Sequence, residues 1–204
     1  MRLRLPLGNA YYDLFVPREM AFLVYPLNTF RHSLVKGFLN FSKESDLNPQ
    51  KILEIGCGNG FFSRILSYRF QKSRILSIDT STRSIQHAQK RNLNNVVFRK
   101  TDFFDVNESF DLIVSLHVFI LLDTEKSIKK LHTMLKDGGI AFLTYTRKTI
   151  FTALHKRFYR FFVGDEIEFK NEKYLLKTAK KYNLKGSIIP LNHHEGSFAL
   201  VLRK

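Results

Sequence analysis

Three of the five residues from 56 to 60 are glycines, within the stretch LEIGCGNGFF (53–62). Glycine loses more backbone entropy on folding than any other residue, so such a cluster is costly unless the backbone requires it. The cluster follows a short apolar run typical of a buried strand and precedes a segment long enough for a helix. A glycine turn between a strand and a helix lies at the carboxyl edge of a parallel sheet, where open α/β folds bind ligands. This feature therefore predicts an α/β fold whose ligand approaches the backbone of this turn.

Strand-like and helix-length segments alternate along the rest of the chain. The expected strands are 51–55, 74–79, 96–102, 110–116 and 139–146, and the expected helices are 28–45, 61–70, 82–92, 124–135 and 171–183. This alternation predicts a parallel sheet covered on both faces. Two further runs, 187–191 and 197–204, are joined by the five residues NHHEG. They predict an antiparallel hairpin at the end of the chain.

Composition restricts the cellular setting and the partners. Cys57 is the only cysteine, so no disulfide can form within the chain, and a reducing compartment, by default the cytoplasm, is expected. The longest apolar stretch, 112–122, is too short for a transmembrane segment. The net charge is +15, and residues 147–204 carry 13 basic against 5 acidic side chains. This excess predicts an acidic partner, such as a nucleic acid, an anionic lipid or an acidic substrate.

A dinucleotide is the first alternative for the ligand of the glycine turn. The dinucleotide-binding pattern G-x-G-x-x-G would require a glycine at position 61, where this chain has Phe61, and the third glycine is instead Gly60. Glu54 also places an acid at the base of the turn, where a dinucleotide would bring an anionic pyrophosphate. The spacing argues against a dinucleotide, and the charge favours a cationic ligand.

With these motifs, residues 51–146 resemble the class I (Rossmann-like) S-adenosylmethionine-dependent methyltransferases. LEIGCGNG is similar to the first cofactor motif of that family. Asp79 and Asp102 end the second and third strands, as acidic residues of that family do. The run FDLIVSLHV resembles the fourth strand, and LKDGGIAFLTY resembles the turn before the fifth strand and that strand itself.

The resemblance implies a fold class and a domain organisation. The fold would be α/β and doubly wound, with a mostly parallel seven-stranded sheet of order 3-2-1-4-5-7-6, an antiparallel last strand and an N-terminal helical segment. Residues 1–204 would form a single methyltransferase domain. Its expected parts are a substrate-capping segment at 1–50, the cofactor-binding core at 51–146, a lid-like basic aromatic insertion at 147–170, and the last helix and hairpin at 171–204.

The resemblance also implies S-adenosylmethionine as the cofactor and S-adenosylhomocysteine as the product. The glycines would admit the methionine part, Asp79 would accept hydrogen bonds from the ribose hydroxyls, and Asp102 would face the adenine amino group beside an apolar neighbour. The residues expected at the cofactor are Glu54, Gly56, Cys57, Gly58, Gly60, Asp79, Thr80, Asp102, Phe103, Ser115 and Leu116. Taken singly, the glycines would also fit a tight turn, the two acids would fit helix N-caps, and Cys57 would fit a small filler of the loop.

Catalytic side chains are few. Methyl transfer from a sulfonium is an in-line displacement, so alignment and exclusion of water suffice unless the acceptor must lose a proton. His117 follows the fourth strand and is the candidate base or acceptor-orienting group, with a helix-cap or core histidine as the alternative. Tyr11, Tyr12, His193 and His194 are candidate substrate contacts. No metal is expected, because two adjacent histidines point in different directions.

The acceptor is the least constrained part of the prediction. Family members that methylate planar amide or nucleobase nitrogens usually carry N/D-P-P-Y/F after the fourth strand, whereas this chain has Ser115-Leu116-His117-Val118. The resemblance therefore favours a small-molecule or lipid-like acceptor and disfavours DNA. An RNA acceptor stays open because of the basic C-terminal region, and a peripheral membrane contact stays open through the amphipathic stretch 147–166. A cofactor-binding interaction module that has lost its chemistry is the non-enzymatic alternative.

Overall fold

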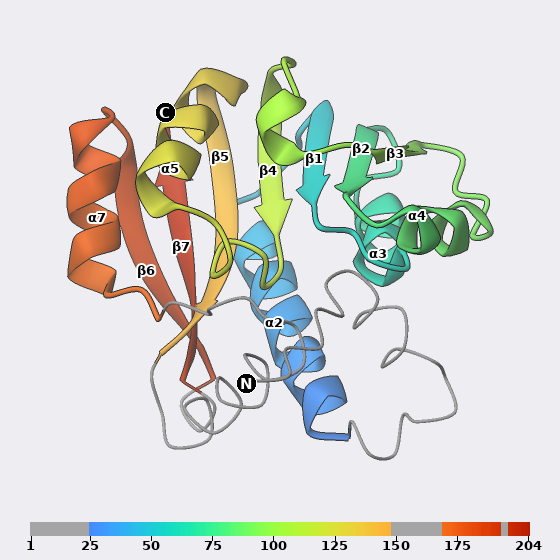
Figure 1. Cartoon of the computed structure of the whole chain (residues 1–204), viewed down its shortest axis with the longest axis horizontal. Helices are drawn as coiled ribbons and strands as arrows, with labels where there is room; N and C mark the ends of the chain where they lie inside the picture. The colour runs from blue at the N-terminus through green and yellow to red at the C-terminus, as the bar shows by residue number, and fades with distance from the viewer. Residues whose placement is uncertain (1–24, 148–168, 193–195) are drawn as a thin grey trace, which may run out of the picture.

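The structure, a computed structural model, describes residues 25–147, 169–192 and 196–204 of the chain. Seven strands form one sheet in the order β3-β2-β1-β4-β5-β7-β6, and only β7 runs antiparallel to its neighbours (Figure 1). The predicted order and the antiparallel last strand are confirmed. The strands are β1 (Lys51–Ile55), β2 (Arg74–Asp79), β3 (Val96–Lys100), β4 (Phe110–Ser115), β5 (Leu135–Thr146), β6 (Lys185–Asn192) and β7 (Ser197–Arg203).

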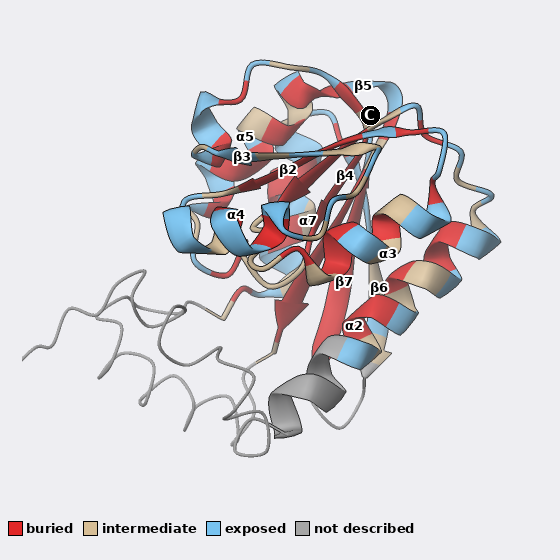
Figure 2. Cartoon of the chain, turned by 90° about the vertical axis from the view of Figure 1, so that its right-hand side faces the viewer, coloured by how far each residue is buried: buried red, intermediate tan, exposed pale blue. Residues whose placement is uncertain are grey.

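Helices cover both faces of this sheet, which is why its central strands are mostly apolar (Figure 2). The helices are α2 (Tyr25–Glu44), α3 (Phe61–Arg69), α4 (Thr82–Gln89), α5 (Thr124–Met134) and α7 (Glu172–Lys181), with a short 3₁₀ helix η2 (Phe103–Asp105). Within the described residues, none of them is both long and apolar enough to cross a membrane.

Alternate residues of each strand point to opposite faces and so build two separate cores. In β1, Ile52 belongs to the core that includes residues of α2 and α3, whereas Leu53 belongs to the core that includes residues of α5 and α7. The α2–α3 core is rich in phenylalanine: the ring of Phe38, fully buried, meets Phe62 edge-on at a centroid distance of 5.2 Å. This alternation fixes on which face each polar residue of the strands must lie, including Glu54.

One strand begins earlier than predicted. The sequence predicts a turn at residues 136–138 and a strand from 139, but β5 already starts at Leu135. The pairing with β4 steps from Phe110–Leu135 to Leu112–Ile140, so an irregularity absorbs the extra residues. The C-terminus holds this stretch in the sheet, because Gly138 N–H donates to the carbonyl of Lys204 at 3.1 Å. A glycine pair that looks like a turn is here part of a strand.

The carboxyl ends of β1, β2, β4 and β5 meet at one edge of the sheet (Figure 1). Arg147 follows β5 at this edge, and its Nε lies 2.5 Å from Oε1 of Glu172 in the first turn of α7. The guanidinium also lies over the ring of Phe198, 5.4 Å from its centroid. These contacts bring together the two chain positions that flank 148–171.

Candidate active site

The glycine loop connects β1 to α3 at the carboxyl edge and is fastened to β2. The N–H groups of Gly56 and Cys57 both donate to the carbonyl of Ile78, at 2.8 and 2.9 Å. All three glycines have a positive φ, which is 74° at Gly56 and 73° at Gly60. A Cβ on Gly56 would lie 2.1 Å from Cγ2 of Val118, so this glycine is required by packing against the loop after β4. A simple tight turn does not account for that close approach.

Gly58 differs from the other two glycines. Its φ is 52°, yet a Cβ built on it would meet no atom within 4 Å, so the backbone here borders open space. A side chain at this position would project into that space and block a ligand that approaches the backbone. Gly58 therefore leaves room for a ligand at the open side of the loop, while Gly56 and Gly60 shape the loop from within.

Asp79 lies at the end of β2 and faces the loop. One carboxylate oxygen accepts a hydrogen bond from the N–H of Gly58 at 2.8 Å, and the other accepts from the N–H of Ser81 at 2.8 Å. The N-cap of α4 is Ser81, whose hydroxyl accepts from Ser84 N–H. Asp79 is therefore not the N-cap of α4, because Ser81 has that role. Asp79 instead places a half-buried negative charge beside the open side of the loop.

Glu54 is buried beneath the loop, with 2% of its surface exposed. Its Oε2 accepts hydrogen bonds from Ser63 on α3 at 2.5 Å and from Ser77 on β2 at 2.6 Å. Burial raises the pKa of Glu54 to about 7, against the opposing effect of the two serine hydrogen bonds, and the nearby Asp79 raises it further. The carboxyl thus links β1, β2 and α3, and it titrates near neutral pH.

The raised pKa of Glu54 makes stability depend on pH. Between pH 4.5, the ordinary pKa of this side chain, and pH 7, the folded chain keeps a proton that the unfolded chain has lost. The free energy of unfolding should therefore fall as pH rises through this window, by roughly 3 kcal/mol. Glu54→Gln keeps an oxygen for both serines but cannot titrate, so its profile should be flatter by that amount. Urea unfolding of both proteins without cofactor measures the difference, and parallel profiles would contradict the assignment.

Asp102 and its neighbours lie at the end of β3. Asp102 is exposed and caps η2 by accepting the N–H of Phe104 at 2.8 Å, so the capping alternative holds for this acid. Phe103 is buried against Phe119, whereas Phe104 is 39% exposed. A ring available to cover a ligand at this position is therefore Phe104, one residue beyond the predicted one. Thr80 is exposed between β2 and α4.

Cys57 is buried, and its burial raises the pKa of the thiol well above the ordinary range. The neutral thiol fits the reading as a small filler of the loop rather than a nucleophile. Ser115 is also fully buried and donates from its hydroxyl to the carbonyl of Ile55 at 3.1 Å, which ties β4 to β1 below the loop. Leu116 packs onto the α2–α3 core.

His117 follows β4 with φ 69°, a left-handed conformation that histidine adopts more readily than most residues. Its N–H donates to the hydroxyl of Thr144 at 2.9 Å, and its Nε2 lies 3.2 Å from the hydroxyl of Thr146. Both threonines belong to the part of β5 that extends past its last pairing with β4. Residues two apart share one face of a strand, so β5 presents two buried hydroxyls to the same histidine. His117 is thus held in a fixed place beside the glycine loop.

We expect Thr146→Val to change the protonation pattern of the His117 ring. The lost hydrogen bond is worth about 1 kcal/mol, which corresponds to a roughly fivefold change in the ratio of the two tautomers. Long-range ¹H–¹⁵N spectra of the imidazole measure this ratio directly and need no substrate. Thr146→Ser, which keeps the hydroxyl, should preserve the wild-type spectrum. Identical ring ¹⁵N shifts in the wild type and Thr146→Val would show that Thr146 does not set the tautomer.

All four predicted substrate contacts lie outside the described residues: Tyr11, Tyr12, His193 and His194. Most of the insertion at 147–170 lies outside them as well. The structure also adds site residues that the sequence reasoning missed: Ser63, Ser77, Thr144, Thr146 and Val118. Only the two threonines carry a signal in the sequence, the period of two in FLTYT. The structure thus brings Glu54, the loop, Asp79 and His117 to one edge of the sheet.

Comparisons with known proteins agree with this geometry. Residues 48–186 match the model of a family described as a methyltransferase domain. The chain is 36% identical over 146 residues to a malonyl-[acyl-carrier protein] O-methyltransferase of Bacillus cereus, a match that covers 68% of this chain and 53% of that protein. An enzyme of the same description from Acetivibrio thermocellus is 36% identical over 109 residues, or 51% of this chain and 38% of that protein. The chain thus spans about half the length, or less, of these curated relatives.

Solved structures share the fold at low sequence identity. Magnesium protoporphyrin IX methyltransferase from Synechocystis PCC 6803, solved with bound SAH, has a TM-score of 0.76 at 16% identity, over 96% of this chain and 93% of that chain. The N-methyltransferase NodS from Bradyrhizobium japonicum WM9 has a TM-score of 0.63 at 22% identity, over 88% and 97%. Since the family model covers more than half of the residues, the chain belongs to the class I S-adenosylmethionine-dependent methyltransferase family.

Proposed function

We propose that this chain transfers the methyl group of S-adenosylmethionine to an oxygen of a carboxylate on a small acyl group. The observation that carries the transfer is the open backbone at Gly58, hydrogen-bonded to the carboxylate of Asp79. The identity to malonyl-[acyl-carrier protein] O-methyltransferases supports the class of acceptor. This acceptor falls within the small-molecule or lipid-like class that the fourth-strand sequence favours.

The cofactor would be held by residues at the ends of four strands, β1 to β4. The proposed set is Glu54, Gly56, Cys57, Gly58, Gly60, Asp79, Thr80, Asp102, Phe103, Ser115 and Leu116, with Phe104 added because it is exposed beside Asp102. Gly58 borders the open side of the loop, and Asp79 offers a charged acceptor for hydroxyl groups. When bound, S-adenosylmethionine supplies a methyl group on a sulfonium leaving group.

The protein's own part in the reaction is to position the acceptor and exclude water. A carboxylate is already deprotonated at neutral pH, so no general base is required. His117 can then act as a hydrogen-bond donor that orients the acceptor, which demands a fixed ring rather than a particular pKa. The contact with Thr146 holds the ring, and the bond from the His117 backbone N–H to Thr144 holds the main chain that carries it. Most of the barrier reduction would come from alignment.

Transfer of a labelled methyl group tests this proposal. Malonyl-[acyl-carrier protein] should accept label from S-adenosylmethionine, and mild alkali should release the label as volatile methanol, because the product is an ester. Acetyl-[acyl-carrier protein], which has the same thioester but no free carboxylate, is the matched control and should remain unlabelled. Equal labelling of both acceptors, alkali-resistant label or no labelling of the malonyl form would refute the proposed reaction.

A further inference from the structure

The helices α5 and α7 lie side by side (Figure 1). Both helices carry exposed lysines. We name this surface the α5–α7 lysine face. It consists of Lys126 and Lys129 on α5, Lys173, Lys177, Lys180 and Lys181 on α7, and Lys185 at the start of β6. The nearby acidic side chains are Asp123, Glu125 and Glu172. The face is therefore strongly basic.

The acids of this face are already bound. Glu125 pairs with Lys181 and also accepts the hydroxyl of Tyr182 at 2.9 Å. Glu172 is bound to Arg147, and Asp123 caps α5 by accepting the N–H of Lys126 at 2.8 Å. The other six lysines of the face form no ion pair with any residue in the described part of the chain. Their charges are available to a partner.

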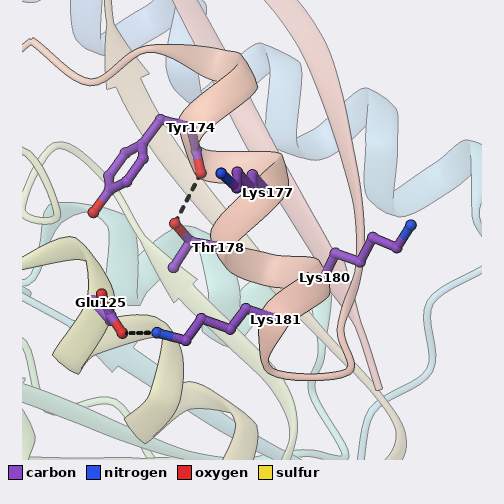
Figure 3. A pocket seen from close by; sticks show the side chains of 6 residues that line it. All are labelled: Glu125, Tyr174, Lys177, Thr178, Lys180 and Lys181. Atoms are coloured by element: carbon purple, nitrogen blue, oxygen red, sulfur yellow. Dashed lines mark hydrogen bonds and ion pairs between the residues drawn. The ribbon is translucent and has the colours of Figure 1, made fainter.

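A groove of about 460 Å³ runs along this face (Figure 3). It is lined by Glu125 of α5 and by Tyr174, Lys177, Thr178, Lys180 and Lys181 of α7. In the close view, Lys181 reaches across to Glu125, whereas Lys180 points away from α5. Tyr174 is 46% exposed and gives the groove an aromatic wall. A bound partner would thus contact a concave surface and the exposed ring of Tyr174 as well as the lysine charges.

The chemistry of the face favours an acidic protein over a nucleic acid. Neither α5 nor α7 contains an arginine, the side chain best suited to bidentate phosphate contacts and to stacking on bases. Lysines act as mobile point charges that speed encounter with an acidic surface and release it readily. A substrate carrier that must leave after each turnover needs that behaviour.

The face also begins at the candidate site. Lys173 follows Glu172, which binds Arg147 at the end of β5 on the carboxyl edge. From there the lysines extend along α7, whose ten residues span about 15 Å. A protein bound along α7 would therefore lie beside the edge where His117 and the glycine loop meet.

We propose that the α5–α7 lysine face docks an acidic protein domain that carries the acceptor. This inference rests on the proposed function for the nature of the acceptor, and on the unpaired lysines and the groove for the docking itself. It assigns to the basic surface a role in substrate delivery.

The test uses the triple variant Lys173→Glu/Lys177→Glu/Lys180→Glu. Its matched control is Lys36→Glu/Lys43→Glu/Lys72→Glu, which changes the net charge equally through exposed lysines on α2 and after α3. We expect the face variant to raise the KM for malonyl-[acyl-carrier protein] by about tenfold or more, with kcat retained. Both variants should treat a malonyl N-acetylcysteamine thioester, which has no protein part, like the wild type. Equal effects of the two variants, or an equal rise in KM for the thioester, would overturn the docking proposal.

Binding measurements separate docking from chemistry. The acyl carrier protein without its malonyl group should bind the wild type and the control at low salt, and should lose binding to the face variant. If that pattern is found but no methyl is transferred, docking stands and the proposed reaction fails. A single-stranded RNA serves as the competing probe. If the face variant loses RNA binding while its binding of the carrier protein is unchanged, the surface is a nucleic-acid site and the proposal is wrong.

Discussion

Asp79→Ala is expected to weaken the binding of S-adenosylhomocysteine by roughly 1.5–3 kcal/mol, or about 10- to 150-fold in Kd. Two effects act together. The substitution removes a charged acceptor for the hydroxyl groups of the cofactor, and it releases the N–H of Gly58, which the carboxylate holds at 2.8 Å. Isothermal titration calorimetry measures the affinity directly. An unchanged Kd would remove Asp79 from the cofactor site.

Asp111→Ala is the matched control for that experiment. Asp111 also accepts two backbone N–H groups, from Gln50 at 3.1 Å and Lys51 at 2.7 Å, but it lies at the opposite, amino edge of the sheet. Burial alone would raise the pKa of this carboxyl, but the contact with Lys136 and the two backbone hydrogen bonds together lower it. Asp111→Ala should lower the stability of the fold and leave the affinity for S-adenosylhomocysteine unaltered. If both variants lost affinity to a similar extent, the loss in Asp79→Ala would be due to general destabilisation and not to a lost contact with the cofactor.

Gly56→Ala is expected to destabilise the fold by about 2–5 kcal/mol, the largest loss that we expect from a single methyl group. The new Cβ would lie 2.1 Å from Cγ2 of Val118, and the φ of 74° is unfavourable for alanine. Urea unfolding measures the loss. Adding Val118→Ala should recover the part that is due to the clash, while the conformational part should remain.

Gly58→Ala separates packing from ligand binding. Its Cβ would meet no atom within 4 Å, so only the conformational cost of φ 52°, about 1–2 kcal/mol, should appear in stability. Affinity for S-adenosylhomocysteine should nevertheless fall, because the methyl group occupies the open side of the loop. If Gly58→Ala destabilised the protein as strongly as Gly56→Ala and left the affinity unchanged, Gly58 would be required for packing rather than for ligand binding.

The sheet could be predicted because its central strands are short apolar runs bounded by turn residues, and β1 and β2 have the expected bounds. The start of β5 could not be predicted in the same way. Gly138 and Gly139 look like a turn until the pairing of Gly139 with Lys204, at the far end of the chain, is known. Local sequence sets the preference, and a distant strand overrides it.

The site shows the same division. The glycine loop and Asp79 could be found because they are close in sequence and have a recognisable spacing. The partners of Glu54 and His117 come from other elements: Ser77 lies 23 residues from Glu54, and Thr146 lies 29 residues from His117. No spacing rule connects such pairs, since their contact arises only when the sheet forms. The residues proposed to bind the cofactor could therefore be named from the sequence, whereas the residues that hold Glu54 and His117 in place could not.

The contact between Arg147 and Glu172 has a consequence for the evolution of this protein. The chain leaves the sheet after β5 at Arg147, and this ion pair joins that point to the first turn of α7. Replacing the segment between them with one of another length would change the entropy of closure only slowly, by about 0.6 kcal/mol for each doubling. Recombination at these two positions could therefore exchange whole segments while leaving the cofactor edge intact. The segment 148–171 is therefore a place where insertions and replacements should leave the fold of the sheet unchanged.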